Sequence, residues 1–216
     1  MGEQRGVIWD VDGTLIDSSE YHRQAWTRAL ASVGYDMTDE DFDRTFGLRN
    51  DSIMRMLLGE DVTSETLQHV ETKKENDYRR QVQDRGIDLL PGVAPWLDKL
   101  RTDGWRQAVG SSAPAANVDL VLNVTGIGHY FDAVLTSADV SKGKPDPEVY
   151  FAAAARLSVN IERCVVVEDA PEAVQGSLRA GIKTVAVRSG RGQGADVEVT
   201  TMSDLAPGAF DRLVPR

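Results

Sequence analysis

Short apolar runs that each end in a polar residue constrain the fold of this chain most strongly. The first run, Gly6-Val7-Ile8-Trp9, is rich in strand-forming residues and ends at Asp10. Similar runs cover residues 105–109, 131–136, 164–167, 183–187 and, more weakly, 197–199. The first run is short, rich in β-formers and without a polar residue, which is typical of a strand that is buried on both faces of a parallel sheet, and the later runs repeat its pattern.

Helical patterns separate these runs. Asp146 and Pro147 are residue types that begin a helix, and strong helix formers with an Ala run follow them. Residues 171–180 begin with Pro171 and end before Gly181, which gives a second helix with a clear start and stop. Strands and helices that alternate in this way predict an α/β fold with a doubly wound parallel sheet.

A segment from about Asp17 to Asp88 interrupts the alternation, because it contains helical patterns and no convincing strand. Its first helical pattern ends at Gly34 and places apolar residues on one face: Tyr21, Ala25, Trp26, Ala29, Leu30 and Val33. A longer and more polar helix is expected over residues 67–82. The acidic run at 36–43 is expected to be a solvated turn and helix N-terminus.

The length of the chain fits this interruption. Its 216 residues are enough for one large domain, or for a core with a smaller appendage, and too few for a third unit. We therefore predict a Rossmann-like core of residues 1–16 and 89–216, with a helical cap of residues 17–88 inserted after the first strand. The Leu90-Pro91-Gly92 segment is expected to mark the return to the core.

Composition limits the partners. The 24 Lys and Arg against 34 Asp and Glu give a net charge of −10, which disfavours nucleic acid because such binding depends on cations against phosphates. A small anionic substrate remains compatible, since a local cation can override the global sign. The single Cys164 excludes an internal disulfide and a zinc thiolate cluster, and it is expected to pack in the core. With neither a signal peptide nor a membrane span in evidence, we expect a cytoplasmic monomer without membrane partners.

Chemically active side chains follow the predicted strands. In open α/β sheets, ligands bind outside the carboxyl ends of the strands. The residues that follow successive runs are Asp10 and Asp12, then Ser111 and Ser112, then Lys144, and finally Glu168 and Asp169. Two carboxylates about 4 Å apart repel each other by about 4 kcal/mol at an effective dielectric constant of 20, so four of them require a cation or raised pKa values. One Mg²⁺ is the simplest solution, because it prefers oxygen ligands and often completes its shell with phosphate.

Carboxylates, Mg²⁺, lysine and serine at one edge indicate phosphoryl transfer. Asp10 ends a rigid strand, which suits a nucleophile that forms an aspartyl-phosphate, and Asp12 can protonate the leaving oxygen and then deprotonate water. The turn at Gly13 would let its amide face the phosphoryl oxygens. Ser111 offers a hydroxyl to an anion, and Lys144 offers a point charge.

Each of these residues also has a simpler interpretation. Ser111 alone is a turn residue, Lys144 alone a solvated lysine, and the Glu168-Asp169 pair alone a helix cap. The acidic segment after the first strand could be a calcium loop, but Leu15 stands where that loop needs glycine. The joint placement at successive strand ends favours the phosphoryl site over these separate interpretations.

Together, these residues resemble the four motifs of the haloacid dehalogenase superfamily, in its phosphatase and phosphomutase branch. The motifs occur in order as Asp10-Val11-Asp12-Gly13-Thr14, Ser111, Lys144-Pro145 and Glu168-Asp169, and the resemblance covers nearly the whole chain with its cap. It implies that Asp10 is the nucleophile and Asp12 the general acid and base. It also implies Mg²⁺ held by Asp10, the Asp12 backbone carbonyl and Asp169, with Glu168 in or near the shell. The second aspartate favours ester substrates.

Within the superfamily, the cap is most similar to the β-phosphoglucomutase-like group. In mutases the residue matching His22 couples cap closure to Asp12, and the one matching Lys74 reaches the substrate. The chain departs from that pattern at Asn50, where mutases place an arginine that holds the distal phosphate; neighbouring Arg49 is a candidate substitute. It departs again at Ala113-Pro114-Ala115, where mutases have a polar loop. Both departures weaken a second phosphate site.

The sequence thus predicts a Mg²⁺-dependent phosphatase of small phosphorylated metabolites, such as sugar or polyol phosphates. The candidate substrate-binding residues are Gly13, His22, Trp26, Gly47, Arg49, Asn50, Lys74 and Ser112. His22 and Lys74 are also compatible with a solvated surface. One alternative is a β-phosphoglucomutase that interconverts β-glucose 1-phosphate and glucose 6-phosphate. A remote alternative is a non-enzymatic phospho-aspartate switch, although such receiver domains lack a cap.

Overall fold

The computed structural model describes residues 4–188 and 194–215, and within them six parallel strands form one sheet. The strands are β1 (Gly6–Trp9), β2 (Arg106–Gly110), β3 (Ala133–Leu135), β4 (Cys164–Glu168), β5 (Lys183–Ala186) and β6 (Val197–Glu198). Their order is β3-β2-β1-β4-β5-β6, and every neighbouring pair is parallel. The predicted α/β fold with a doubly wound parallel sheet is confirmed.

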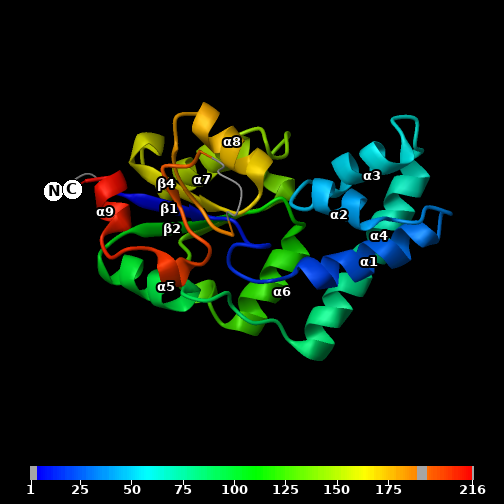
Figure 1. Cartoon of the computed structure of the whole chain (residues 1–216), viewed down its shortest axis with the longest axis horizontal. Helices are drawn as coiled ribbons and strands as arrows, with labels where there is room; N and C mark the ends of the chain where they lie inside the picture. Colours follow the sequence, from blue (N-terminus) through cyan, green and yellow to red (C-terminus); the bar gives the residue numbers. More distant parts are fainter. Residues whose placement is uncertain (1–3, 189–193, 216) are drawn as a thin grey trace.

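Helices cover both faces of the sheet because the strands are apolar on both sides. One face carries Val7 and Trp9 and packs against α5 (Val93–Thr102), α6 (Ala115–Thr125) and α9 (Ala209–Leu213). The other face carries Ile8 and packs against α7 (Glu148–Leu157), with α8 (Pro171–Arg179) beside α7 in Figure 1. Short 3₁₀ turns complete the chain: η1 (Gly128–Tyr130), η2 (Ser137–Asp139), η3 (Ile161–Arg163) and η4 (Met202–Asp204).

The central position of β1 sets the location of the site. The chain runs outward from β1 through β2 to β3, and later outward on the other side through β4, β5 and β6. The carboxyl end of β1 therefore lies at the point where the strand order reverses, which is where open α/β sheets bind their ligands. Asp10 follows β1 directly, and its amide extends the ladder by donating to the Val167 carbonyl at 3.0 Å.

The start of α7 differs slightly from the prediction. The helix begins at Glu148, and Pro147 is the residue that precedes its first turn. Asp146 still acts as a cap, because its Oδ1 accepts a hydrogen bond from the Glu148 amide at 3.0 Å. The predicted start, with Asp146 as the N-cap and Pro147 in the first turn, was therefore wrong by one residue.

Four helices form the segment that interrupts the sheet, and we call them the cap. They are α1 (Ser19–Ala31), α2 (Asp39–Thr45), α3 (Asn50–Leu58) and α4 (Ser64–Arg85). The cap has an apolar cluster of its own, built around Trp26, Leu30, Phe42, Ile53 and Met54. Figure 1 shows these helices together at one end of the molecule, with α9 at the other end. The acidic run at 36–43 does begin a helix, since Thr38 caps α2.

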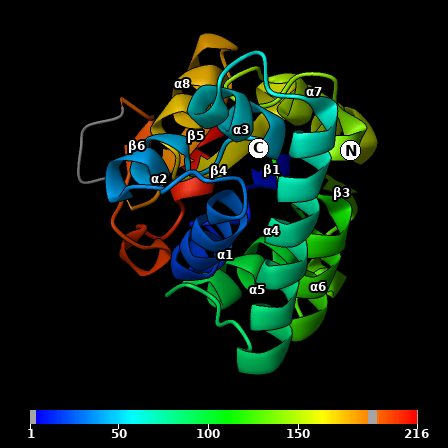
Figure 2. The ribbon, with the colours of Figure 1, turned by 90° about the vertical axis from the view of Figure 1, so that its right-hand side faces the viewer.

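The long helix α4 links the cap with the core. It packs along α1 inside the cap and also contacts α6 of the core, and Figure 2 shows α4 running beside both helices. Buried Ala25, Tyr78 and Val82 form the contact between α1 and α4, with Leu120 of α6 against them. A side chain on α4 can therefore touch the cap and the core at once. In the described part of the chain, every helix is too short or too polar to cross a membrane.

Candidate active site

Lys144 joins two of the predicted acidic residues at the carboxyl edge of the sheet. Its Nζ donates to Asp10 Oδ1 at 2.5 Å and also to Glu168 Oε1. The Tyr150 hydroxyl of α7 donates to the same Glu168 oxygen at 3.1 Å. Glu168 Oε2 accepts from the backbone amides of residues 169 and 170 at 2.9 and 3.2 Å. Glu168 is thus fixed from both sides, and it holds the lysine against Asp10.

Asp169 completes the group that we call the carboxylate cluster, which consists of Asp10, Glu168 and Asp169. Each of the three offers a carboxylate oxygen, and these oxygens all lie within 4.8 Å of one another. The Thr14 hydroxyl donates to Asp169 Oδ1 at 3.3 Å. Gly13 makes room for this carboxylate, because a Cβ at that position would lie 2.1 Å from Asp169 Oδ2.

The predicted use of the Gly13 amide is wrong. That amide donates to the Ile16 carbonyl at 2.8 Å, inside the tight turn that follows β1, and so it is not turned toward a substrate oxygen. The backbone of Gly13 has a φ of 87°, a conformation that residues with a Cβ rarely adopt. The glycine is needed for this turn and for the close approach of Asp169.

The carboxylate cluster holds more negative charge than its surroundings balance. Burial and the charge of Glu168 raise the pKa of Asp10 well above its ordinary value, against the opposing effect of Lys144. Burial and Glu168 likewise raise the pKa of Asp169 to about 8. Burial favours the neutral form of Lys144, but Asp10 and Glu168 outweigh it and raise the pKa of the lysine, so it remains an ammonium group. Among the described side chains of this group, three carboxylates therefore face one buried cation, Lys144.

A divalent cation fits this donor set. All three members of the cluster are oxygen donors, as Mg²⁺ prefers, and the raised pKa values of Asp10 and Asp169 indicate missing positive charge. The oxygens of Glu168 already accept hydrogen bonds from Lys144, Tyr150 and two amides. Asp10 and Asp169 are therefore the better candidates for direct metal ligands, and Glu168 holds the surrounding groups in place.

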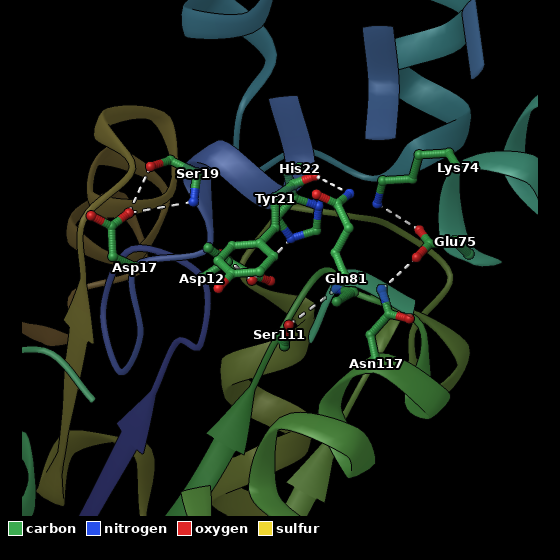
Figure 3. A network of polar contacts seen from close by, with 12 residues as sticks. Asp12, Asp17, Ser19, Tyr21, His22, Lys74, Glu75, Gln81, Ser111 and Asn117 are labelled. Carbon is green, nitrogen blue, oxygen red and sulfur yellow. Dashed lines mark hydrogen bonds and ion pairs between the residues drawn. The ribbon is translucent and has the colours of Figure 1, made fainter. Parts of the chain in front are cut away.

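Asp12 lies apart from the carboxylate cluster and is bound by the first helix of the cap. The Ser18 hydroxyl donates to Asp12 Oδ1 at 2.5 Å, and His22 Nε2 lies 3.0 Å from the same oxygen. His22 is itself buried, and its ring stacks on Tyr78 of α4 with centroids 4.1 Å apart. Burial acts to raise the pKa of Asp12, but His22 and Ser18 lower it to about 2. Figure 3 shows His22 reaching toward Asp12.

The loop after β2 supplies the second predicted group of hydroxyls. Ser111 is buried, and its Oγ accepts a hydrogen bond from the Ala113 amide at 3.0 Å. The Ser112 Oγ is buried and has no hydrogen-bond partner among the described residues. Both serines line the same cavity as Asp10 and Asp12. Pro114 lies just before the first residue of α6.

The cavity beside Asp10 lies between the core and the cap and has a volume of about 40 Å³. Its core side is formed by Asp10, Asp12, Ser111, Ser112, Ala113 and Pro114, and its cap side by His22, Trp26, Phe42, Thr45, Phe46, Gly47, Leu48, Asn50, Ile53 and Lys74. Of the predicted substrate-binding residues, His22, Trp26, Gly47, Asn50, Lys74 and Ser112 therefore meet around one space. Typical ligand pockets are much larger, at roughly 300–1,000 Å³.

Arg49 lies outside this cavity. Its guanidinium donates to the Val140 carbonyl at 3.3 Å and to Asp51 at 3.3 Å, and it lines a neighbouring depression. The aliphatic part of its side chain crosses Gly143, where a Cβ would lie 2.3 Å from Arg49 Cδ. Next to it, a Cβ at Gly47 would lie 3.1 Å from the Cβ of Ala170. The 47–49 segment thus packs against the core loops that carry Lys144 and Asp169.

Lys74 is buried inside the cavity wall and is not on a solvated helix face. It is 2% exposed, and its Nζ lies 5.2 Å from the centre of the Trp26 ring and 5.5 Å from that of Tyr78. The ammonium donates to Glu75 Oε1 at 2.7 Å. His22 is also buried, at 7% exposure. For both residues, the solvated alternative is wrong because α1 and α4 turn these side chains toward the core.

Several residues around the site were missed by the sequence analysis. Ser18, Thr14 and Tyr150 hold the carboxylates, and Glu75 binds Lys74. Ser18 had a usable signal, because it stands between Asp12 and the start of a helix. Tyr150 had no such signal. An aromatic residue on the apolar face of a helix is expected to pack in the core, and the sequence does not show what its hydroxyl group contacts.

Comparison with known proteins agrees with this arrangement. The sequence model of the haloacid dehalogenase-like hydrolases matches residues 7–187. A β-phosphoglucomutase of Bacillus subtilis is 30% identical over 208 residues, covering 93% of this chain and 91% of that protein. A fructose-1-phosphate phosphatase of Escherichia coli is 29% identical over 187 residues, covering 85% of this chain and 96% of that protein.

A solved structure has the same fold. The crystal structure of a β-phosphoglucomutase from Clostridium difficile superposes with a TM-score of 0.85 at 25% identity, covering 97% of this chain and 96% of that one. The sheet order, the inserted cap and the four motif regions are thus consistent with one family. The chain belongs to the haloacid dehalogenase-like hydrolases, in the β-phosphoglucomutase-like group, and is an enzyme with phosphatase or phosphomutase activity.

Proposed function

We propose that this protein is a Mg²⁺-dependent phosphatase of small sugar or polyol monophosphates that acts through an aspartyl-phosphate on Asp10. The observation that carries the proposal is the placement of Asp10, which is held by Lys144 at the end of β1, belongs to the carboxylate cluster and lines the cavity under the cap. Relatives that act on phosphorylated sugars support the substrate class.

The first half of the reaction uses both aspartates of the first motif. A carboxylate oxygen of Asp10 forms a bond to phosphorus, and the bond from phosphorus to the ester oxygen breaks. The leaving oxygen takes a proton from Asp12. A bound Mg²⁺, held by Asp10 and Asp169, would neutralise charge on the phosphoryl oxygens. Lys144 keeps Asp10 oriented, and Ser111 and Ser112 are placed to donate hydroxyl hydrogen bonds to the phosphoryl group.

The second half returns Asp10 to its starting state. Asp12 accepts a proton from water, whose oxygen bonds to phosphorus while the bond to Asp10 breaks and inorganic phosphate leaves. His22 and Ser18 stabilise the ionised form of Asp12 in the closed cap. Phosphoryl oxygens beside Asp12 act in the opposite direction, because a nearby negative charge favours its protonated form. Substrate binding therefore prepares Asp12 to act as an acid.

The cap must open to admit a substrate, because the closed cavity is far smaller than a sugar phosphate. We propose residues 17–88 as the domain that moves. The two points where the chain enters and leaves this segment are adjacent, since Ile16 pairs with Leu89 and the Leu90 amide donates to the Leu15 carbonyl at 2.9 Å. Such a pair of neighbouring connections provides a hinge, and closure then excludes bulk water.

Two features favour hydrolysis over phosphomutase activity. The loop between Ser112 and α6 presents Ala113 and Pro114 to the cavity, so it lacks polar groups for a second phosphate. Arg49, the candidate substitute for a distal phosphate ligand, is directed toward the Val140 carbonyl. A phosphomutase must bind a bisphosphate intermediate at both ends, whereas a phosphatase needs only one phosphate site.

Two assays test the proposal. In the first, phosphate release is measured with Mg²⁺ on a panel of sugar and polyol monophosphates, and turnover of at least one is expected. In the second, the protein is given β-glucose 1-phosphate and a trace of glucose 1,6-bisphosphate. Free phosphate supports the phosphatase, whereas glucose 6-phosphate without phosphate release supports the mutase. A stable phospho-Asp10 without turnover of any ester would support the non-enzymatic switch instead.

A further inference from the structure

Lys74 is a buried cation in the wall of the cavity. We define the cap end of the cavity by Trp26, Asn50 and Lys74. Of the described residues that line the cavity, Lys74 is the only lysine or arginine. The remaining cap wall is mostly apolar: Phe42, Phe46, Leu48 and Ile53. Any charged group at the far end of a substrate would therefore depend on Lys74 for its counter-charge.

Lys74 already has a counter-charge of its own. Glu75 is 4% exposed, and its Oε1 accepts from Lys74 Nζ at 2.7 Å and from Asn50 Nδ2 at 2.8 Å. Its Oε2 accepts from the side-chain amide of Asn117, at the start of α6. Figure 3 shows Glu75 between Lys74 of the cap and Asn117 of the core. Burial acts to raise the pKa of Glu75, but Lys74 and the two amides lower it, so the group is an ionised carboxylate.

The nearby arginines do not change this balance. Arg49 donates to the Val140 carbonyl and to Asp51, away from the cavity. Arg79 donates to Asn117 at 3.0 Å and to Asn76 at 2.7 Å. Neither of them lines the cavity of Asp10. Among the described buried side chains at the cap end, one ammonium and one carboxylate are therefore in contact and their charges cancel, while the Glu71 carboxylate on the other side of Asn50 is exposed to solvent.

We propose that Glu75 is a specificity-determining residue, which neutralises Lys74 and so restricts the site to monophosphates whose far end carries no charge. A second phosphate would lose its hydration against an apolar wall and meet no net positive charge, which is unfavourable. Uncharged hydroxyl groups still find donors, because the Lys74 ammonium has three N–H groups and Glu75 takes one of them. This inference rests on the proposed phosphatase, whose substrate it narrows.

The test uses two ligands that differ only in the second phosphate, fructose 1-phosphate and fructose 1,6-bisphosphate. Their dissociation constants are measured by calorimetry with Mg²⁺ in the Asp10→Asn protein, so that neither ligand is consumed. We expect the bisphosphate to bind at least about tenfold more weakly than the monophosphate. Adding Glu75→Gln, which keeps the shape of the side chain, should shift this ratio toward the bisphosphate by about tenfold or more, because Lys74 is then unpaired.

Three further variants separate charge from structure. Glu71→Gln removes a carboxylate one turn away on α4 that also accepts from Asn50, and it should change the ratio by less than about twofold, because exposed charges are screened. Lys74→Met leaves Glu75 unpaired and should shift the ratio the other way. The combination of Lys74→Met with Glu75→Gln should abolish the gain seen with Glu75→Gln alone.

Several outcomes overturn the inference. One is a parent protein that binds the bisphosphate as tightly as the monophosphate. Another is a Glu75→Gln variant that weakens both ligands equally, which would indicate a purely structural role. If that variant does not fold, Lys74→Met still decides, because an unchanged ratio contradicts the proposal. Failure of the phosphatase itself is a separate result: the protein with Asp10 intact would release no phosphate from fructose 1-phosphate or any other monoester, whatever the binding ratio.

Discussion

The carboxylate cluster and the cap end of the cavity hold buried charge in opposite ways. In the cluster, three carboxylates surround the buried cation Lys144, and burial and mutual repulsion raise the pKa values of Asp10 and Asp169. At the cap end, Lys74 and Glu75 match one to one, and the pKa of Glu75 is lowered. The carboxylate cluster is arranged to bind a positive charge, whereas the cap end is arranged to bind an uncharged group.

This difference assigns the reaction to the carboxylate cluster and the choice of substrate to the cap end. Three carboxylates and one ammonium leave two negative charges, which one Mg²⁺ would neutralise. Unbalanced charge that awaits a ligand is what a site for phosphoryl transfer requires. A balanced pair contributes little attraction for a charged group, so it discriminates by rejecting the wrong substrate. Substitutions confined to one region test whether the other region is affected.

The largest effect is expected from Asp10→Asn. This change removes the nucleophile but keeps the side-chain shape, so turnover should fall by about 10⁴-fold or more. Phosphate release in steady state measures it, and circular dichroism should show an unchanged fold. Residual activity within about tenfold of the parent would rule out covalent catalysis by Asp10.

Asp12→Ala should have the next largest effect. The loss of a general acid and base costs about 10²- to 10⁴-fold in rate, and both half-reactions should slow because Asp12 acts in each. Rapid-quench measurement of the phosphoenzyme separates formation from hydrolysis. The Ser18→Ala variant is a useful comparison, since it removes one hydrogen bond from Asp12 and leaves its carboxylate in place. An unchanged rate for Asp12→Ala would exclude the assigned role.

Gly13→Ala tests whether the cluster depends on close packing. The new Cβ would meet Asp169 at 2.1 Å and would sit at a positive φ, so Mg²⁺ should bind about 10- to 100-fold more weakly. Gly34→Ala is the matched control, because Gly34 also has a positive φ but no atom within 4 Å of the added Cβ. Calorimetric titration with Mg²⁺ measures both. Equal losses would attribute the effect to backbone strain alone.

Lys74→Ala alters the cap end only. Turnover of a sugar phosphate should fall by about tenfold, while that of p-nitrophenyl phosphate, which lacks a polyhydroxyl tail, should change by about threefold or less. The ratio of kcat/KM for the two substrates is the measurement. An equal loss on both would place Lys74 outside the specificity pocket and would remove the division between the two regions.

The sequence predicted the cluster better than the cap end, and the reason is geometric. Parallel strands bring their carboxyl ends to one edge, so Asp10, Lys144 and Asp169 are placed by counting strands. The cap offers no such rule. Whether Lys74 is buried depends on how α1 and α4 pack, and the meeting of Glu75 with Asn117 depends on how the cap closes on the core. Arg49 illustrates the limit, since its neighbour Asn50 lines the cavity and it does not.

Local structure had the same limits. The buried strands were predictable because short runs of β-branched residues favour strands, whereas only the start of α2 was predicted, in the acidic run at 36–43, and α3 was not predicted as a separate helix because it is short. The Gly13 amide was assigned to the substrate because a sharp turn of the backbone was expected there, but the amide donates to the Ile16 carbonyl inside that turn. A sequence pattern can predict the conformation of such a turn, but the hydrogen-bond partner of its amide depends on the fold.

Thermal stability, rather than turnover, should show the two regions responding to pH in opposite directions. The raised pKa of Asp169, about 8 against an ordinary 3.8, means that the folded protein holds a proton that the unfolded chain releases, so without metal stability falls as pH rises from about 4 to 8. The lowered pKa of Glu75 has the reverse sign, so its contribution is present above its unfolded pKa and is lost as pH falls below about 4.5.

Two variants separate these contributions in thermal melts recorded between pH 3.5 and 8 without metal. Asp169→Asn should flatten the decline toward pH 8, whereas Glu75→Gln should reduce the loss on the acid side. Added Mg²⁺ requires ionised carboxylates, so it should raise the melting temperature of the parent more at pH 8 than at pH 5.5 and should affect the Asp169→Asn protein less. A metal-induced shift that is equal at both pH values would contradict the unbalanced charge of the cluster. If Asp169→Asn also altered the loss of melting temperature at acid pH, the titrations of the two regions would be coupled and their charges could not be separated.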